Sequence, residues 1–90
     1  MQLTNDGEYQ VTELFPEAAN SSILTFYTSG AGTARLTYSD DSGQDIDITD
    51  GDITAPSQTK VCCGYGANLF IQLSGVSAAT PFNLEIRKVQ

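Results

Sequence analysis

The sequence predicts an all-β fold, a small single-domain antiparallel β-sandwich that is jelly-roll-like or Greek key, with about 7–8 short strands. Four segments alternate apolar and polar residues with the period of two that turns one face of a strand toward a core. Clusters of Gly, Asp, Ser and Pro separate the strands at intervals of roughly 8–12 residues. Ninety residues support one hydrophobic core, so we predict a single domain over residues 1–90.

The four segments are recognised by their alternating apolar members. These are Ala34, Leu36 and Tyr38, then Ile46 and Ile48, then Leu69, Ile71 and Leu73, and finally Phe82, Leu84 and Ile86. Polar or charged residues stand between them in most cases, which predicts strands with one buried and one solvated face.

Less regular segments complete the predicted sandwich. Residues 9–12 alternate as a strand and lose the pattern before Pro16, and residues 16–20 have room for a single helical turn. Residues 22–28 are apolar on both faces, which predicts a strand covered on both sides, with a neighbouring subunit on one of them. Residues 59–63 form a shorter strand, and residues 1–6 are expected to be a loose N-terminal arm that a partner orders.

Charge excludes some classes of partner. Eleven acidic residues stand against four basic ones, which are scattered along the chain, and the net charge is −7. This charge repels phosphate groups, so we expect no nucleic-acid binding and no binding to anionic membrane surfaces. The first residues lack the basic start and apolar run of a signal peptide, and no stretch approaches the roughly 20 apolar residues of a membrane span.

The residue types also disfavour catalysis. Histidine is absent, so the commonest general base is missing, and we expect no enzyme and no cofactor. Cys62 and Cys63 are adjacent, and neighbouring strand residues point to opposite faces, so they cannot bridge without distortion. We interpret them as small, buried or half-buried apolar residues of a protein made in a reducing compartment.

A weak metal candidate lies between residues 40 and 52, where six aspartates occur in thirteen residues. Crowded carboxylates suit calcium, and Asp45, Asp47 and Asp50 are the candidate ligands. The glycine and glutamate spacing of an EF-hand is not present. The alternative, which we favour, is a solvated strand face whose charges discourage edge-to-edge pairing.

Three aromatic or apolar residues are candidates for contact with a partner. Tyr65 lies between two glycines in a predicted loop, where it either anchors in a partner or stacks on a sugar, or folds back as a lid on the sandwich. Leu24 and Phe26 lie in the strand with two apolar faces and are the other candidates for partner contact.

Three segments carry a family resemblance, namely 36–43 (LTYSDDSG), 50–55 (DGDITA) and 66–75 (GANLFIQLSG). Together with the residues between them, over about residues 33–89, they resemble the small acidic all-β virion proteins of tailed bacteriophages, of the capsid decoration, cement or adaptor type.

The resemblance implies a non-enzymatic structural protein of a virus particle, most plainly a capsid decoration or cement protein that stabilises the shell by subunit contacts. It further implies capsid or other virion proteins as partners, a homo-oligomer such as a trimer, assembly in the host cytoplasm, and a final location in the virion. The alternative function is a small glycan- or calcium-dependent binding module at a fibre or tail tip.

Overall fold

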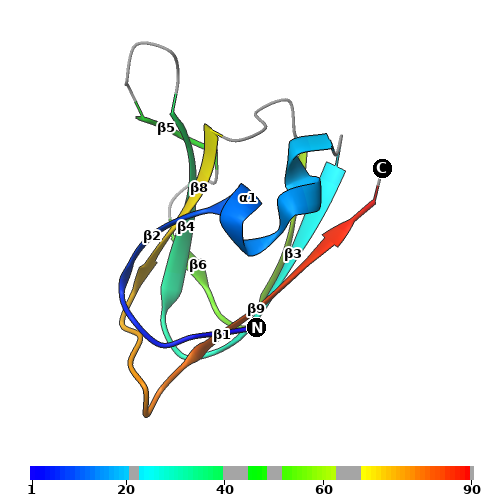
Figure 1. Cartoon of the computed structure of the whole chain (residues 1–90). Helices are drawn as coiled ribbons and strands as arrows, with labels where there is room; N and C mark the ends of the chain where they lie inside the picture. The colour runs from blue at the N-terminus through cyan, green and yellow to red at the C-terminus, as the bar shows by residue number, and fades with distance from the viewer. Residues whose placement is uncertain (21–22, 40–44, 49–51, 63–67, 90) are drawn as a thin grey trace.

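The chain forms two antiparallel β-sheets packed face to face in a computed structural model (Figure 1). The structure describes residues 1–20, 23–39, 45–48, 52–62 and 68–89. The elements in chain order are β1 (Gln2–Leu3), β2 (Gly7–Gln10), α1 (Val11–Leu14), the 3₁₀ helix η1 (Pro16–Asn20), β3 (Ile23–Gly30), β4 (Thr33–Ser39), β5 (Asp45–Asp47), β6 (Ile53–Thr54), β7 (Ser57–Cys62), β8 (Leu69–Ser74) and β9 (Phe82–Lys88).

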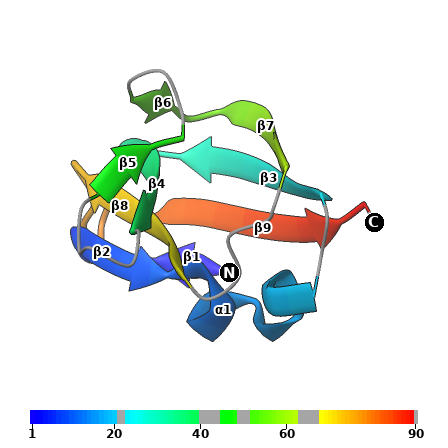
Figure 2. The same ribbon diagram turned by 90° about the horizontal axis from the view of Figure 1, so that it is seen from above.

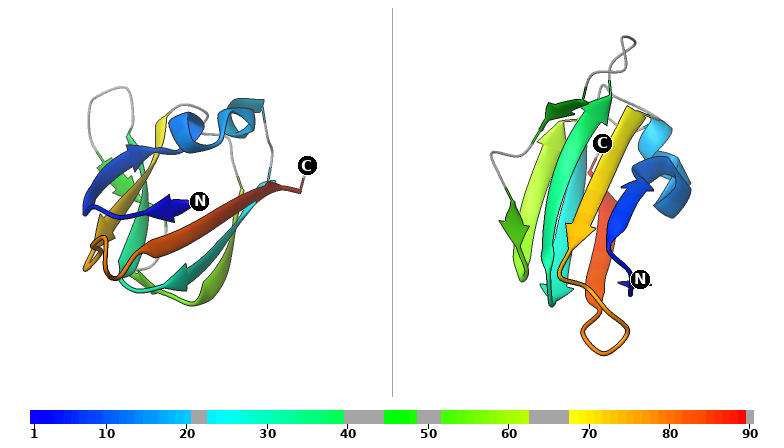
Figure 3. Two further views of the ribbon diagram at one scale, coloured as in Figure 1. Left: turned by 60° about the horizontal axis from the view of Figure 1, so that its bottom comes forward. Right: turned by 90° about the vertical axis from the view of Figure 1, so that its left-hand side faces the viewer.

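The strand order resolves the predicted sandwich as a jelly roll. The four-stranded sheet has the order β1-β9-β3-β7, and the five-stranded sheet has the order β2-β8-β4-β5, with β6 also paired to β4. β5 and β6 meet β4 at different points along its length, so they act as two halves of one strand (Figure 3, right). The chain is therefore one long hairpin in which β1 pairs with β9, β2 with β8, β3 with β7, and β4 with β5 and β6, rolled into two sheets.

The regular segments of the sequence form strands as predicted. The segments around Leu36, Ile71 and Leu84 are β4, β8 and β9, and their alternating apolar side chains are buried except for the half-buried Tyr38. The all-β sandwich is thus confirmed. The described part of the chain holds nine strands because the two-residue strands β1 and β6 add to the predicted number.

Both sheets contribute to a single core. The four-stranded sheet supplies Leu24, Phe26 and Phe82, which are at most 1% exposed, and the five-stranded sheet supplies Leu36 and Ile71, which are equally buried. Each such side chain contributes about 1.5–3 kcal/mol by leaving water, so the core dominates the stability of the fold.

A short helical crossing carries the chain from one sheet to the other. α1 follows β2, and η1 precedes β3, so together they connect the five-stranded sheet to the four-stranded sheet. Val11 is fully buried and Ala18 is 2% exposed, so the crossing covers the side of the core near β1 and β2. Figure 2 shows this side lying opposite to the strands β6 and β7. Residues 16–20 adopt the helical turn predicted for them, but Val11–Leu14 leaves the predicted strand and is helical. No helix of the described residues is long and apolar enough to cross a membrane.

Residues 1–6 pack within the fold, which corrects the prediction of a loose N-terminal arm. β1 pairs with β9, and Met1 and Leu84 exchange two backbone hydrogen bonds of 2.8 and 2.9 Å. The side chain of Leu3 is 9% exposed and packs in the core. The carboxylate of Asp6 accepts a 2.7 Å hydrogen bond from the backbone amide of Val76. Burial of Leu3 and completion of the sheet edge therefore fix this segment within the chain's own fold.

Candidate functional site

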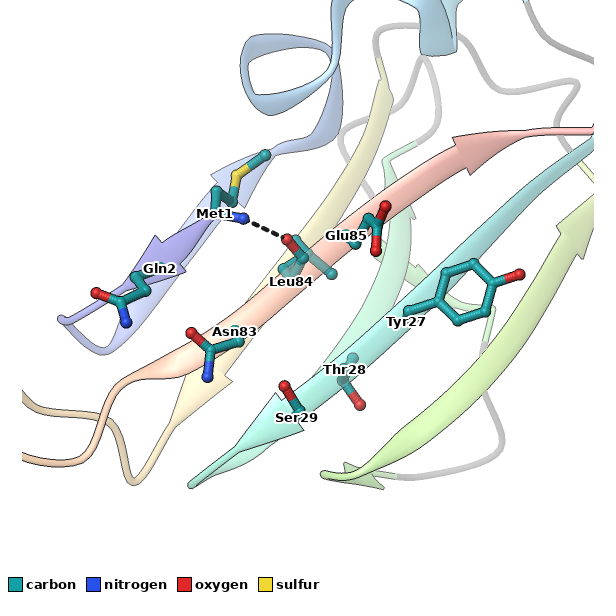
Figure 4. A pocket seen from close by; sticks show the side chains of 8 residues that line it. All are labelled: Met1, Gln2, Tyr27, Thr28, Ser29, Asn83, Leu84 and Glu85. Carbon is teal, nitrogen blue, oxygen red and sulfur yellow. Dashed lines mark hydrogen bonds between the residues drawn. The ribbon is translucent and has the colours of Figure 1, made fainter.

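A groove lies on the outward face of the four-stranded sheet, where β1, β9 and β3 run side by side (Figure 4). It has a volume of about 340 Å³ and is lined by Met1, Gln2, Tyr27, Thr28, Ser29, Asn83, Leu84 and Glu85. This volume is at the lower end of the range for small-molecule sites, roughly 300–1,000 Å³. We call it the β9 groove.

The register of the strands arranges the groove in two rows of side chains. Gln2 pairs with Asn83, and Asn83 pairs with Ser29, so two amides and a hydroxyl stand in one row across three strands. Tyr27 pairs with Glu85 in the next row along β3 and β9. Directly opposed residues of an antiparallel pair share a face, so all five side chains project to the same side of the sheet.

The floor of the groove is fixed by backbone pairing and packing. The hydrogen bonds between Met1 and Leu84 hold β1 against β9, and the first of them is drawn in Figure 4. The side chain of Leu84 is 1% exposed and belongs to the core, and Thr28 is 6% exposed. Polar groups of the groove therefore rest on rigid strands rather than on loops.

Arg87 organises the aromatic end of the groove. Its guanidinium donates to the carboxylate of Glu85 through Nε and Nη2, both at 2.9 Å, and its Cζ lies 5.2 Å from the centroid of the Tyr27 ring. The hydrogen bond with Glu85 is the main cause that raises the pKa of Arg87 above the ordinary value of an arginine. Arg87 stands one row away from Tyr27, on the side opposite to Asn83 and the amide row, so it supports the ring without lining the groove.

The prediction that Leu24 and Phe26 contact a partner is wrong. Leu24 is 0% exposed and Phe26 is 1% exposed, and both point into the core, so neither reaches a partner. The strand is covered on its inward face by the chain's own second sheet. Its outward face carries half-buried Ile23 and Tyr27 and the buried side chain of Thr25. The third candidate, Tyr65, lies outside the described residues.

Two aspartates of the acidic segment, Asp47 and Asp52, lie near the guanidinium of Arg35. Arg35 on β4 lies 3.1 Å from a carboxylate oxygen of Asp52 and 3.9 Å from one of Asp47. The described residues contain no group of three or more side chains suited to a metal. Asp45 is described in its backbone as part of β5, and Asp50 lies outside the described residues, so the calcium hypothesis stays a prediction.

The outward face of the five-stranded sheet is largely bonded within itself. Gln72 donates a 2.8 Å hydrogen bond to Glu8 across the β2–β8 pair. Phe70 is half-buried beside Thr37, its register partner on β4. The hydroxyl of Thr37 is buried and has no hydrogen-bond partner among the described residues, which makes it an exception on this face.

Comparison of the chain with models of protein families, with curated proteins and with solved structures found no match. On the described residues, the chain is a jelly-roll sandwich with a polar groove on the outward face of its four-stranded sheet. Sequence reasoning missed Gln2, Tyr27, Asn83 and Glu85 as candidate site residues. Alternation marks Asn83 and Glu85 as outward residues of their strand, but the pairing of β1 with β9 has no local signal in the sequence.

Proposed function

We propose that the chain is a non-enzymatic structural protein of a virus particle, of the capsid decoration or cement type, which stabilises the shell by contacts between subunits. Its partners are capsid or other virion proteins and further copies of itself in a homo-oligomer, with a trimer as the expected form. It assembles in the host cytoplasm and resides in the virion.

The observation that carries this proposal is the jelly-roll strand order. Two sheets of order β1-β9-β3-β7 and β2-β8-β4-β5 are the architecture used by viral capsid domains and by lectins. Fold alone does not define function, so this support is an analogy at the level of architecture.

The segments that carry the family resemblance converge in space, which adds a second support. Their described parts lie in β4, β6 and β8, and β4 pairs with both of the other strands. The resemblance therefore concerns one continuous part of the five-stranded sheet rather than scattered turns.

The side of the sandwich formed by β5, β6 and β7 is the contact surface that we assign to neighbouring subunits. Within the described residues each of these strands pairs along one edge only, and the side lies opposite to the helical crossing (Figure 2). Ile46 on β5 is 46% exposed, although its sequence position predicts burial. An exposed apolar side chain on a free strand edge is a feature that favours pairing with another chain.

Sedimentation velocity of the purified chain tests the proposal. We expect a concentration-dependent oligomer that Ile46→Lys shifts toward monomer, because a charge at the strand edge opposes pairing. Val89→Lys is the matched control, since Val89 is 50% exposed but lies beyond the end of β9. Mass spectrometry of virus particles from the source of the gene is the second measurement. A chain that stays monomeric at every concentration and is absent from purified particles would refute the proposal.

A further inference from the structure

We infer that the β9 groove is a binding site for a neutral saccharide, of the size of one or two sugar rings. This inference goes beyond a structural role, since contacts that stabilise a shell do not require a ligand groove. It is carried by the chemistry of the groove side chains, by their arrangement in two rows, and by the charge around them.

The first row supplies the hydrogen bonds that sugar hydroxyls need. Each hydroxyl of a sugar both donates and accepts a hydrogen bond. The side-chain amides of Gln2 and Asn83 offer donors and an acceptor each, and the hydroxyl of Ser29 offers both in one atom. Neighbouring strands are about 4.7–4.9 Å apart, so the row presents these groups across roughly 10 Å, a span that matches a small ring with its substituents.

The second row supplies an apolar surface beside a strong acceptor. The ring of Tyr27 can stack on the C–H face of a sugar, and tyrosine brings a large contact area with only two rotatable angles. Glu85 lies opposite Tyr27 in the register and accepts hydrogen bonds from ligand hydroxyls. Arg87 contacts the ring and the carboxylate together, so both groups are held in place before a ligand arrives.

The charge around the groove favours a neutral ligand over an anionic one. Glu85 carries a negative charge in the groove, and the chain has a net charge of −7, so phosphorylated, sulfated and sialylated ligands are repelled. The positive charge of Arg87 already pairs with Glu85, and Arg87 stands outside the lining. A purely apolar ligand is disfavoured because amide, hydroxyl and carboxylate groups would lose their water without replacement.

The test is a glycan microarray probed with the labelled chain, followed by titration of ¹⁵N-labelled protein with free sugars. The free sugars are glucose, galactose, N-acetylglucosamine and their β-linked disaccharides. We expect at least one neutral saccharide to shift the amide signals of Gln2, Asn83 and Glu85. Tyr27→Ala and Asn83→Ala should each weaken that binding by about tenfold or more, which corresponds to the loss of one good contact.

Three further variants keep the test decisive. Ser29→Tyr fills the groove from an exposed strand position and should abolish binding even if Tyr27→Ala is poorly folded. Tyr27→Phe retains the ring and should bind nearly as well as the wild type. Asn68→Ala removes an exposed amide just before β8, away from the groove, and should leave affinity unchanged. Binding of anionic glycans alone, or of no saccharide on the array, would overturn the inference, as would binding that Ser29→Tyr leaves intact.

Discussion

The guanidinium of Arg87 lies over the ring of Tyr27, with its Cζ 5.2 Å from the ring centroid, and the same group is bound by the carboxylate of Glu85. Three side chains from two neighbouring strands are thereby joined on the outward face of the sheet. A cation over an aromatic face is attracted by the negative charge density of the ring. The contact thus gives the β9 groove an aromatic wall of defined orientation.

The contacts of Arg87 predict how its contribution to stability depends on pH. The pKa of Arg87 is raised in the folded chain by the hydrogen bond with Glu85, so its contribution to stability is fully present below the ordinary pKa of an arginine and is lost only as pH rises through the raised value. Arg87→Gln should therefore lower the melting temperature by no more than about 5 °C. The difference from wild type should stay constant between about pH 6 and about pH 9.

Thermal melts of Arg87→Gln across this pH range check the prediction. Lys60→Gln is the matched control, because it removes the same charge from the same sheet face at a position that pairs with Thr25 and not with Tyr27. A difference between Arg87→Gln and wild type that grows or vanishes within this range would contradict a permanently charged guanidinium.

Burial of Leu24 and Phe26 predicts a large loss of stability on truncation. Leu24→Ala should cost about 2–5 kcal/mol and Phe26→Ala about 3–5 kcal/mol, because each leaves a cavity in the core. Urea unfolding of the isolated chain measures the loss of unfolding free energy in both variants. Ile86→Val is the control for a small truncation in the core and should cost about 0.5–1.5 kcal/mol. Variants that unfold like wild type would instead assign these residues to a partner surface.

The sequence predicted most of the architecture because period-two patterns survive in the strands that span the core. β8 and β9 alternate between buried and more exposed side chains, and β4 does so from Thr33 to Leu36, which is enough to predict each as a strand. The two-residue strands β1 and β6 are too short to show a period. Val11 fits a strand pattern after Tyr9, but the chain must cross between the sheets there, and a helical turn achieves this while burying Val11.

The residues of the candidate site are much harder to predict from the sequence than the strands are. In β3 both faces are rich in apolar residues, and alternation alone does not show which set faces inward, so the sequence does not distinguish the buried Leu24 and Phe26 from the outward Tyr27. The groove also depends on Gln2 lying beside Asn83, a pairing of residues from the two ends of the chain. Such a pairing is set by the rolled topology and not by local sequence.

Calcium should have little effect on the protein. Arg35 lies between Asp47 and Asp52 and neutralises part of the charge that would attract the ion. We expect millimolar calcium to leave the melting temperature unchanged. We also expect Arg35→Gln to cost less than about 1 kcal/mol, because the ion pairs are exposed. A calcium-induced rise in melting temperature that is absent from the Asp45→Ala, Asp47→Ala double variant would instead establish calcium binding.

The turn from β3 to β4 predicts a strict requirement for glycine. Gly30 has a φ of +88°, and a Cβ there would meet the backbone oxygen of Pro81. Gly75 has a similar φ of +76°, but its Cβ would meet only ordinary contact distances. Both alanine variants should incur the backbone cost of about 1–3 kcal/mol, and Gly30→Ala should be clearly less stable than Gly75→Ala in urea unfolding. Equal losses would mean that Pro81 moves aside without cost.

Two buried threonines with different hydrogen bonding give opposite predictions for the same substitution. The hydroxyl of Thr28 lies 2.6 Å from that of Ser57, whereas the hydroxyl of Thr37 has no partner among the described residues. Thr28→Val should therefore lower the free energy of unfolding by about 1 kcal/mol, because it removes a hydrogen bond and leaves Ser57 without that partner. Thr37→Val should raise it by about 1 kcal/mol, since it removes a buried polar group that gains nothing from the fold.

Urea unfolding of the two valine variants, under identical conditions, measures the difference directly. Both residues lie in central strands and are at most 6% exposed, so strand propensity and burial change alike in the pair, and the remaining difference reports the hydrogen bond. If Thr37→Val is as destabilising as Thr28→Val, the hydroxyl of Thr37 must have a partner in solution. A bound water that hydrogen-bonds to this hydroxyl would account for such a result.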